Sequence, residues 1–245
     1  MRISHERDFG HEDRERLYNY VESHGSATEQ ELKREFPDID PSGLRHHVAI
    51  LRRDGYLERD GDGELHAAFE EGVEEEHRDG ELTFTVRPAR QEDLAGIVGA
   101  IRQVAEEKTY IEAESVADVV DHEEVLLRHN EIEYRMFFVA TVGKEVVGWV
   151  HLNAPEIEKL SHTAELTVGV LDEYRGHGIG SHLLERGLSW AAEHQLEKVY
   201  QSIPASNDDA IAFLDHHGWD TEAVREDHYK IGADYVDEVM MAIEI

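Results

Sequence analysis

The chain has 245 residues, of which 55 are Asp or Glu and 24 are Lys or Arg, and its formal net charge is -31. Its length and 40% apolar content allow one large domain or two ordinary ones, while the lack of cysteine excludes disulfides, thiolate metal sites and a cysteine nucleophile. No apolar run reaches the roughly 18 residues that a membrane span needs, and the charged residues 1–13 are unlike a signal peptide. We therefore expect a cytoplasmic protein with no membrane partner.

The acidic residues are spread along the whole chain rather than gathered in a tail. Three interpretations are open: the solvated surface of a halophile, an acidic partner-binding surface, or disorder. Regular apolar patterning argues against disorder. We favour the halophilic surface, because the Debye length shrinks to about 3 Å near 1 M salt and like charges then repel one another little.

Three helices and a hairpin are predicted in the first 66 residues. The first helix spans about 13–24. Thr28 and Glu31 form a capping-box pattern ahead of the second, and Asp40 followed by Pro41 is typical of the start of a third, which ends at Gly55. The pieces 56–59 and 64–66, separated by an Asp/Gly-rich turn, predict a β-hairpin.

This order of elements resembles a winged helix-turn-helix domain, with the third helix in the recognition position and the hairpin as wing. The resemblance implies DNA contact through the positive cluster on that helix, which consists of Arg45, His46, Arg52 and Arg53. Residues 1–66 nevertheless hold 10 Lys or Arg against 16 Asp or Glu, whereas phosphate neutralisation normally dominates DNA affinity. Dimerisation or protein contact, including a homodimer, therefore stays open as the alternative role.

Residues 67–81 lack periodicity and are dense in Glu, so they are interpreted as a linker. The remaining 82–245 predict a mixed β-sheet with helices on its faces, hence an α/β (α+β) domain. The expected strands are 82–88, 136–142, 145–152, 164–170, 198–204 and 235–245, and the expected helices are 91–105, 116–129, 179–193 and 208–216.

A glycine-rich turn joins the strand 164–170 to the helix 179–193. It contains Gly176, Gly178 and Gly180, which let backbone N–H groups approach an anion at the positive end of the helix. No Lys-Ser/Thr pair follows the last glycine, so the pattern is not a Walker loop, and its spacing is not the dinucleotide fingerprint. The sequence predicts a phosphate-binding turn.

With this turn, the order of elements and the segment from Asn207 to Trp219, the part 82–245 resembles the GNAT superfamily of acetyl-CoA-dependent N-acetyltransferases. The resemblance implies that acetyl-CoA is the co-substrate. It also implies that the strand 164–170 splays from its neighbour and presents free amides, and that the turn holds the CoA pyrophosphate, although the side chain of His177 is expected to face solvent. The implied cofactor-binding residues are Val168, Val170, Arg175, Gly176, His177, Gly178, Ile179, Gly180, Ser181 and Asn207.

Acetylation of an ammonium group requires a base, and departure of the CoA thiolate gains from an acid. Glu165, on the splayed strand, is the candidate catalytic base; its alternative reading is an exposed strand carboxylate. Many family members carry a Tyr acid directly after the position of Phe213, where this chain has Leu214. Solvent could protonate the thiolate, and three other side chains could replace the Tyr: His216, His217 and Tyr235.

The 17 histidines include adjacent pairs at 46–47 and 216–217. Neighbours on a helix point about 100° apart and do not readily share one ion, and the sequence has no HExxH pattern. We therefore expect no metal site.

The leading hypothesis is an acetyl-CoA-dependent N-acetyltransferase acting on a primary amine of a small molecule or of a protein lysine or N-terminus, fused behind a winged-helix domain. An alternative is a DNA-binding regulator whose GNAT domain senses acyl-CoA without turnover. A third is that the winged helix recruits the protein to be acetylated. Acceptor specificity in this fold comes from regions corresponding to 109–130 and 153–162, whose sequences do not name the acceptor.

Overall fold

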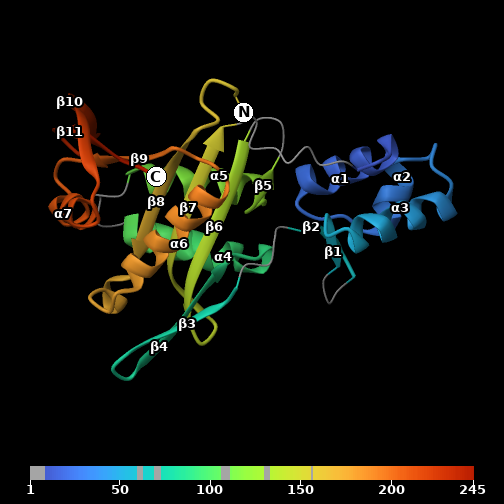
Figure 1. Cartoon of the computed structure of the whole chain (residues 1–245), viewed down its shortest axis with the longest axis horizontal. Helices are drawn as coiled ribbons and strands as arrows, with labels where there is room; N and C mark the ends of the chain where they lie inside the picture. Colours follow the sequence, from blue (N-terminus) through green and yellow to red (C-terminus); the bar gives the residue numbers. More distant parts are fainter. Residues whose placement is uncertain (1–8, 60–62, 69–72, 106–110, 130–132, 156) are drawn as a thin grey trace.

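The computed structural model describes residues 9–59, 63–68, 73–105, 111–129, 133–155 and 157–245. Two separate hydrophobic clusters form in it, one from residues of the first 67 positions and one from residues 82–243. Figure 1 shows the N-terminal helices as a unit beside the large sheet. No helix in the described part of the chain is long and apolar enough to cross a membrane.

The N-terminal part contains three helices and a two-stranded sheet, as predicted. These elements are α1 (Glu12–His24), α2 (Glu29–Glu35), α3 (Pro41–Arg53), β1 (Leu57–Arg59) and β2 (Leu65–Ala67). The capping box of Thr28 and Glu31 and the Asp40 cap before Pro41 are both present. In addition, Ala27 and Leu65 exchange backbone hydrogen bonds of 2.9 Å, which ties the segment between α1 and α2 to the hairpin.

The second part is built on a nine-stranded sheet. Eight strands follow the order β10-β11-β9-β8-β7-β6-β4-β3, and the ninth, β5, pairs with β6. Among the strands of the described residues, only the β8–β9 pair of this sheet is parallel. The strands are β3 (Glu75–Asp79), β4 (Leu82–Pro88), β5 (Arg128–His129), β6 (Glu133–Val142), β7 (Glu145–Pro155), β8 (Thr163–Val170), β9 (Lys198–Pro204), β10 (Asp220–Ile231) and β11 (Asp234–Glu244).

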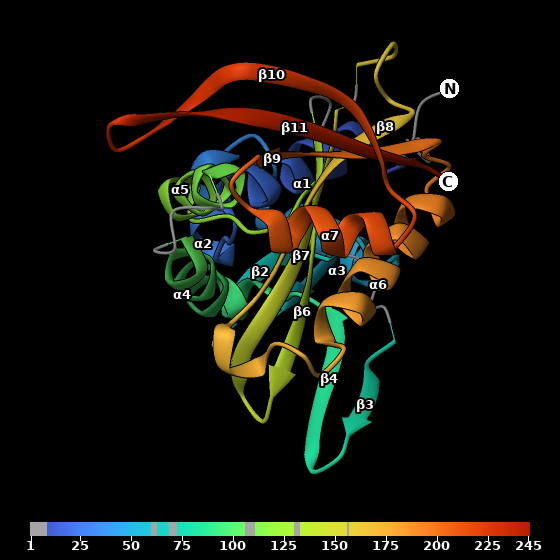
Figure 2. The ribbon, with the colours of Figure 1, turned by 90° about the vertical axis from the view of Figure 1, so that its left-hand side faces the viewer.

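Helices cover both faces of this sheet. α4 (Leu94–Ala105) and α5 (Ile111–Glu123) lie on one face, and α6 (Ile179–Glu193) lies on the other, with α7 (Asp208–His216) beside its first turn (Figure 2). Short 3-10 turns, Gln91–Asp93 and Asp172–Tyr174, precede α4 and the glycine turn.

Four of these observations correct the sequence predictions. The linker expected over 67–81 is wrong for Glu75–Asp79, which pairs with β4 as an edge strand whose charged side chains face solvent. The helix expected over 116–129 runs instead from Ile111 to Glu123 and is followed by Glu124 at a positive φ of 56°. Its expected last residues belong to β5. Strand β10 was not predicted at all, because its first nine residues are all exposed and show no apolar alternation.

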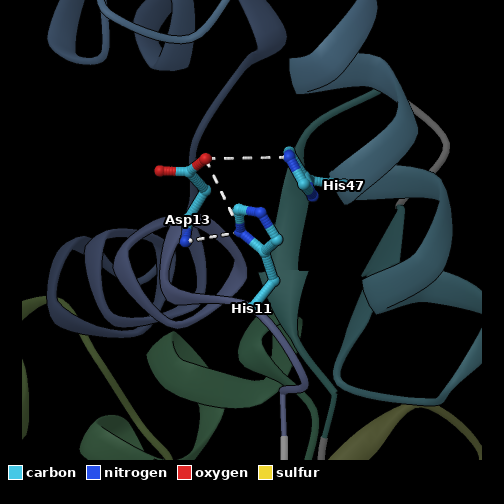
Figure 3. Close-up of side chains that lie close together, drawn as sticks. All are labelled: His11, Asp13 and His47. Carbon is cyan, nitrogen blue, oxygen red and sulfur yellow. Dashed lines mark hydrogen bonds and ion pairs between the residues drawn. The ribbon is translucent and has the colours of Figure 1, made fainter.

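The first and third helices of the N-terminal part pack through a fully buried core that includes Leu17, Val21, Leu44 and Leu51. At one end of this contact His11, the residue that caps α1, lies beside His47 of α3 (Figure 3). The two helices are thus in contact through polar as well as apolar side chains.

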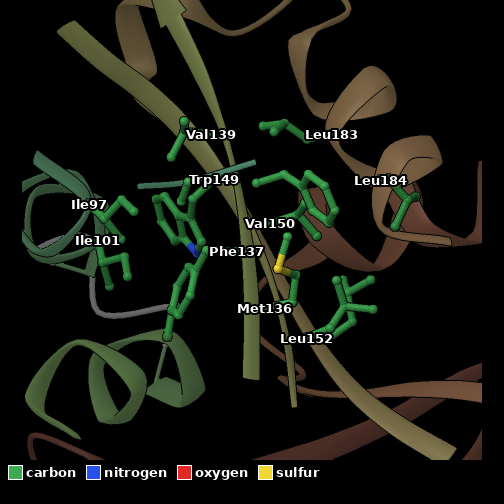
Figure 4. Close-up of a cluster of buried hydrophobic side chains, with 14 of the residues drawn as sticks. Ile97, Ile101, Met136, Phe137, Val139, Trp149, Val150, Leu152, Leu183 and Leu184 are labelled. Atoms are coloured by element: carbon green, nitrogen blue, oxygen red, sulfur yellow. The ribbon is translucent and has the colours of Figure 1, made fainter. Parts of the chain in front are cut away.

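The main core lies on both faces of β6 and β7. Along β7, Trp149 points toward Ile97 and Ile101 of α4, whereas Val150 and Leu152 point toward Leu183 and Leu184 of α6 (Figure 4). This alternation follows from the two-residue period of a strand, and it explains why β6 and β7 are apolar on both faces.

Candidate active site

β8 and β9 pair over only part of their length. The parallel register joins Thr163–Glu165 of β8 to Lys198–Tyr200 of β9. The described remainder of β8 pairs with β7 but not with β9. Where the strands diverge lies a cavity of about 420 Å³, bounded by β8, β9, the first turns of α6 and α7, and the start of α5. The splay implied by the family resemblance is therefore present.

Backbone groups of β8 face this cavity. The Leu171 N–H donates to the Val147 carbonyl of β7 at 2.9 Å, and Val168 and Val170 lie opposite Val150 and Gly148 in the antiparallel register. Because N–H direction alternates along an antiparallel strand, the N–H groups of Val168 and Val170 point away from β7, toward the splay. Both residues line the cavity.

The glycine turn forms one end of the cavity. Gly176 and Gly178 have φ of +81° and +78°, a left-handed conformation that side-chain-bearing residues rarely adopt, and Gly178 is the N-cap of α6. The Nε of Arg175 donates to the Val170 carbonyl at 3.0 Å, which closes the turn onto the end of β8. Lining residues of this turn are Arg175, Gly176, Gly178, Ile179, Gly180 and Ser181.

His177, predicted with this turn, does not line the cavity. Its Nδ1 lies 2.7 Å from a carboxylate oxygen of Asp79 at the end of β3. Beside it, the ring of His182 in the first turn of α6 stacks on His77 of β3, with ring centroids 3.8 Å apart. The side chain of His177 thus ties the turn to the edge strand, and only its backbone belongs to the turn.

The far side of the cavity is polar. Asn207 caps α7 by accepting from the Ala210 N–H at 3.2 Å and is 7% exposed. Gln201 of β9 and Thr167 of β8 also line the cavity, and each has a buried side-chain oxygen without a hydrogen-bond partner among the described residues. Such atoms are suited to a ligand rich in amide and hydroxyl groups. The cavity therefore offers unpaired polar atoms along its wall, and the glycine turn offers backbone N–H groups at one end.

Glu165 lies in an adjoining cavity of about 250 Å³ between α5 and the sheet. Thr167 and Glu112 line both cavities, so the two spaces adjoin. Burial raises the pKa of the Glu165 carboxyl above its usual value, and the charges of Glu112 and Glu238 raise it further. A carboxylate with a raised pKa at the edge of a cavity is a suitable proton acceptor.

Three side chains of this second cavity were not predicted from the sequence: Thr167, His151 and Asn153. On β7, His151 lies opposite Thr167, and Asn153 lies opposite Glu165. His151 is 4% exposed, and neither of its ring nitrogens has a partner among the described residues. Burial, with a smaller contribution from the charge of Arg135, lowers the pKa of His151 to about 3. It is therefore neutral at ordinary pH.

The position of the missing acid is apolar. Leu214 is 1% exposed and lines the main cavity. Of the suggested substitutes, His216 is exposed, and Tyr235 is 62% exposed on the β10–β11 hairpin. His217 lies nearer: its Nδ1 is 2.7 Å from the Phe213 carbonyl and its Nε2 is 3.0 Å from the Ser181 hydroxyl. Since a carbonyl only accepts, Nδ1 carries a proton, and in the neutral ring Nε2 then accepts from Ser181.

The four side chains predicted to contact DNA are all exposed on α3: Arg45, His46, Arg52 and Arg53. Arg53 also donates to the carboxylate of Asp54, with an Nε–O distance of 2.6 Å. This pairing reduces the positive charge that the end of the helix presents.

Comparisons with known proteins agree with this geometry. Residues 105–219 match the model of the acetyltransferase (GNAT) family. The N-alpha-acetyltransferase of Saccharolobus solfataricus is 29% identical over 161 residues, which cover 62% of this chain and 89% of that protein. The mycothiol acetyltransferase of Corynebacterium glutamicum is 33% identical over 88 residues, or 35% of this chain. The match spans only 27% of the length of that relative.

Among solved structures, a GNAT-family acetyltransferase from Streptococcus pneumoniae superimposes with a TM-score of 0.54 at 20% identity. The superposition covers 66% of this chain and 99% of that one, which shows a shared fold. The residues that match the family model include both the splayed strands and the glycine turn. The sheet-containing part of this protein therefore has the fold of GNAT-family acetyltransferases, and residues 105–219 within it match the model of that family.

Proposed function

We propose that this protein is an acetyl-CoA-dependent N-acetyltransferase that acts on a primary amine. The observation that carries the proposal is the pair of adjoining cavities. One is bounded by the glycine turn and the outward N–H groups of Val168 and Val170, and the other contains Glu165, with Thr167 and Glu112 shared between them. A thioester held in the first cavity would meet an amine entering through the second.

Acetyl-CoA supplies the activated acetyl group. Backbone amides from Gly176 to Ser181 hold its pyrophosphate, aided by the positive end of α6. The N–H groups of Val168 and Val170 bind the pantetheine and polarise the thioester carbonyl, where negative charge develops. Asn207, which lines the same cavity, contacts the pantetheine arm.

Glu165 removes the proton from the ammonium group of the acceptor, directly or through a water molecule. Its raised pKa brings its proton affinity closer to that of an amine. Leu214 can neither donate nor accept a proton, so the departing thiolate takes its proton from solvent. A thiol with a pKa near 8.5 needs little assistance at neutral pH.

A cationic acceptor is favoured by the charges near the second cavity. Three carboxylates, those of Glu112, Glu133 and Glu165, line it against one cation, Arg135, so acidic groups outnumber basic ones there. The proteins named N-alpha-acetyltransferase and mycothiol acetyltransferase both match this chain at modest identity. We infer a peptide N-terminus or another primary amine as the acceptor.

The test is release of free CoA from acetyl-CoA with a panel of N-terminal peptides, lysine peptides and polyamines, in molar KCl. Turnover with at least one class of amine is expected. Tight binding of acetyl-CoA with no turnover on any acceptor would reject the enzyme and favour a sensor.

The second candidate function is a DNA-binding regulator whose acetyltransferase domain senses acyl-CoA. Exposure of Arg45, His46, Arg52 and Arg53 on one helix, together with the apolar Leu214, favours it. In a footprint upstream of its own gene at high salt, Arg52→Ala with Arg53→Ala should abolish protection. The matched control is Lys33→Ala with Arg34→Ala on α2, which removes the same charge. Equal protection by both double variants would reject α3 as the DNA-contacting helix.

A further inference from the structure

A cluster of two histidines and one aspartate joins α1 to α3 in the N-terminal part of the protein. His11 caps α1, Asp13 lies in its first turn, and His47 projects from α3 toward both (Figure 3). The Asp13 Oδ2 lies 3.6 Å from the His11 Nδ1 and 3.8 Å from the His47 Nε2. One ligand atom from each residue lies within 4.8 Å of the others.

These donors and separations suit a transition-metal ion. Imidazole nitrogen and carboxylate oxygen bind Zn²⁺ at about 2.0–2.2 Å, so two ligands of a tetrahedral ion lie roughly 3.4 Å apart. The two separations from Asp13, 3.6 Å and 3.8 Å, are close to this value, and the three ligand atoms all lie within 4.8 Å of one another, so binding an ion draws the side chains together. Three protein ligands leave a fourth position for water.

The carboxylate is already held in a suitable orientation. Arg16 donates to the Asp13 Oδ1 at 3.1 Å and to Asp38 at 2.8 Å, which leaves Oδ2 facing the two imidazoles. Outer contacts of this kind orient metal ligands in established sites. Arg16 is therefore the positioning residue of the cluster.

His47 has no hydrogen bond to either ring nitrogen within the described residues. Its Nδ1 is buried without a partner, and its Nε2 is too far from Asp13 for a hydrogen bond. A polar ring held between two helices with neither nitrogen bonded indicates that a further group completes its contacts. An ion between Nε2 and Oδ2 would supply the contact that Nε2 lacks.

His11 has a competing role. Its Nδ1 accepts the Asp13 N–H at 3.1 Å, which caps α1. A neutral imidazole has one ring lone pair, so binding an ion exchanges this cap for a metal–nitrogen bond. A substitution that preserves the cap can therefore separate the two roles.

We propose that His11, Asp13 and His47 bind one divalent transition-metal ion of the Zn²⁺ class. The expectation of no metal site was based on histidines adjacent in sequence, whereas the fold pairs His47 with a residue 36 positions away. The ion joins α1 to α3, so it stabilises the N-terminal part and fixes the helix that carries Arg45 and Arg52.

The test is calorimetric titration of the metal-stripped full chain with ZnCl₂. One site per chain is expected, and His47→Ala and His11→Asn should each weaken it at least about tenfold. Asn keeps a side-chain oxygen that caps the helix, so His11→Asn removes the ligand without removing the cap. His46→Ala, which removes the exposed neighbouring imidazole, is the matched control and should leave the affinity unchanged.

Co²⁺ provides a second readout. The wild-type chain should give the visible absorption bands of four-coordinate Co²⁺, and His47→Ala should lose them while retaining its helical circular dichroism. Equal Zn²⁺ affinity in wild type, His11→Asn and His47→Ala would overturn the proposal. An equal loss of affinity in His46→Ala would also overturn it.

Discussion

At the scale of single residues, the carboxyl of Glu165 combines burial with two acidic neighbours, Glu112 and Glu238, and its pKa is raised as a result. A base must be ionised to accept a proton, so the acid limb of kcat/KM should lie at a higher pH than that of an ordinary glutamate. Glu165→Gln should lower the rate by about 100-fold or more below the pKa of the amine. The variant should recover at alkaline pH, where the amine loses its proton without help.

Initial rates of CoA release from pH 5 to pH 10 measure this effect. Glu133→Gln is a matched control, since Glu133 lines the same cavity from β6. A Glu165→Gln profile parallel to that of wild type at every pH would exclude Glu165 as the base.

His151 should make the fold sensitive to acid. Its pKa is lowered to about 3 by burial and by Arg135. In the unfolded chain the pKa of His151 is about 6.5. At pH values between about 3 and 6.5, the unfolded chain therefore binds a proton at His151 that the folded chain does not. This contribution to stability is therefore complete above about pH 6.5 and is lost as the pH falls.

We expect His151→Phe, which keeps an aromatic ring beside Phe137, to remove this dependence. Between pH 6 and pH 4 the free energy of unfolding of wild type should fall relative to the variant by about 1.4 kcal/mol per pH unit. Urea denaturation at each pH measures it. A constant difference between the two proteins across this range would contradict the depressed pKa.

The candidate site residues fall into two groups: those placed by neighbouring residues in the sequence, and those placed by the pairing of distant strands. Gly176 and Gly178 could be predicted because a strand, a glycine turn and a helix follow one another in the sequence. The position of Glu165 ahead of this turn could be predicted for the same reason, since both lie on one continuous stretch of sequence. His151 lies on β7, and it meets Thr167 only through the cross-strand register. A single sequence does not state that register, so His151 could not be predicted.

At the scale of elements, β8 packs against β7 with no space for a side chain at Gly169. A Cβ at Gly169 would lie 2.2 Å from the fully buried ring of Trp149. Gly169→Ala must therefore displace either the ring or the strand that carries Val168 and Val170. We expect a loss of about 1–3 kcal/mol in the free energy of unfolding and weaker acetyl-CoA binding.

Thermal denaturation and titration with acetyl-CoA measure the two effects. Gly99→Ala is the control, because a Cβ at this exposed position of α4 would meet nothing within 4 Å. It should be neutral or slightly stabilising. Equal stability of the two alanine variants would mean that Gly169 is not needed for close packing.

Elements with one buried face were predicted well, and exposed elements were not. β9 and α7 have the bounds expected from their apolar spacing. β3 and β10 are charged edge strands that gain their partners from β4 and β11. The helix α5 was displaced in the prediction because the buried Leu126 and Leu127 continue its apolar pattern after the chain has left the helix.

At the scale of the whole molecule, the net charge of -31 should make stability depend on salt. The Debye length falls from about 10 Å at 0.1 M to about 3 Å at 1 M, which screens repulsion among the carboxylates. We expect the Tm at pH 7 to rise by about 5–10 °C over this range of KCl, equivalent to a few kcal/mol for a chain of this size.

The same titration near pH 4.8, the isoelectric point, is the control, because the net charge there is close to zero. The rise in Tm should shrink markedly. A Tm at pH 7 that is independent of KCl, or a rise of the same size at both pH values, would mean that repulsion among the acidic residues does not limit stability.

The edge strand β3 sets where the unit built on the nine-stranded sheet begins. It pairs with β4, its Asp79 bonds the His177 of the glycine turn, and its His77 stacks on His182. The unit therefore extends beyond the family match of residues 105–219, from Glu75 at its start to β11 at its end. A gene fusion that joined a foreign front domain at residue 82 would discard contacts to the glycine turn. A fusion that keeps these contacts must therefore join the two parts of this protein upstream of Glu75.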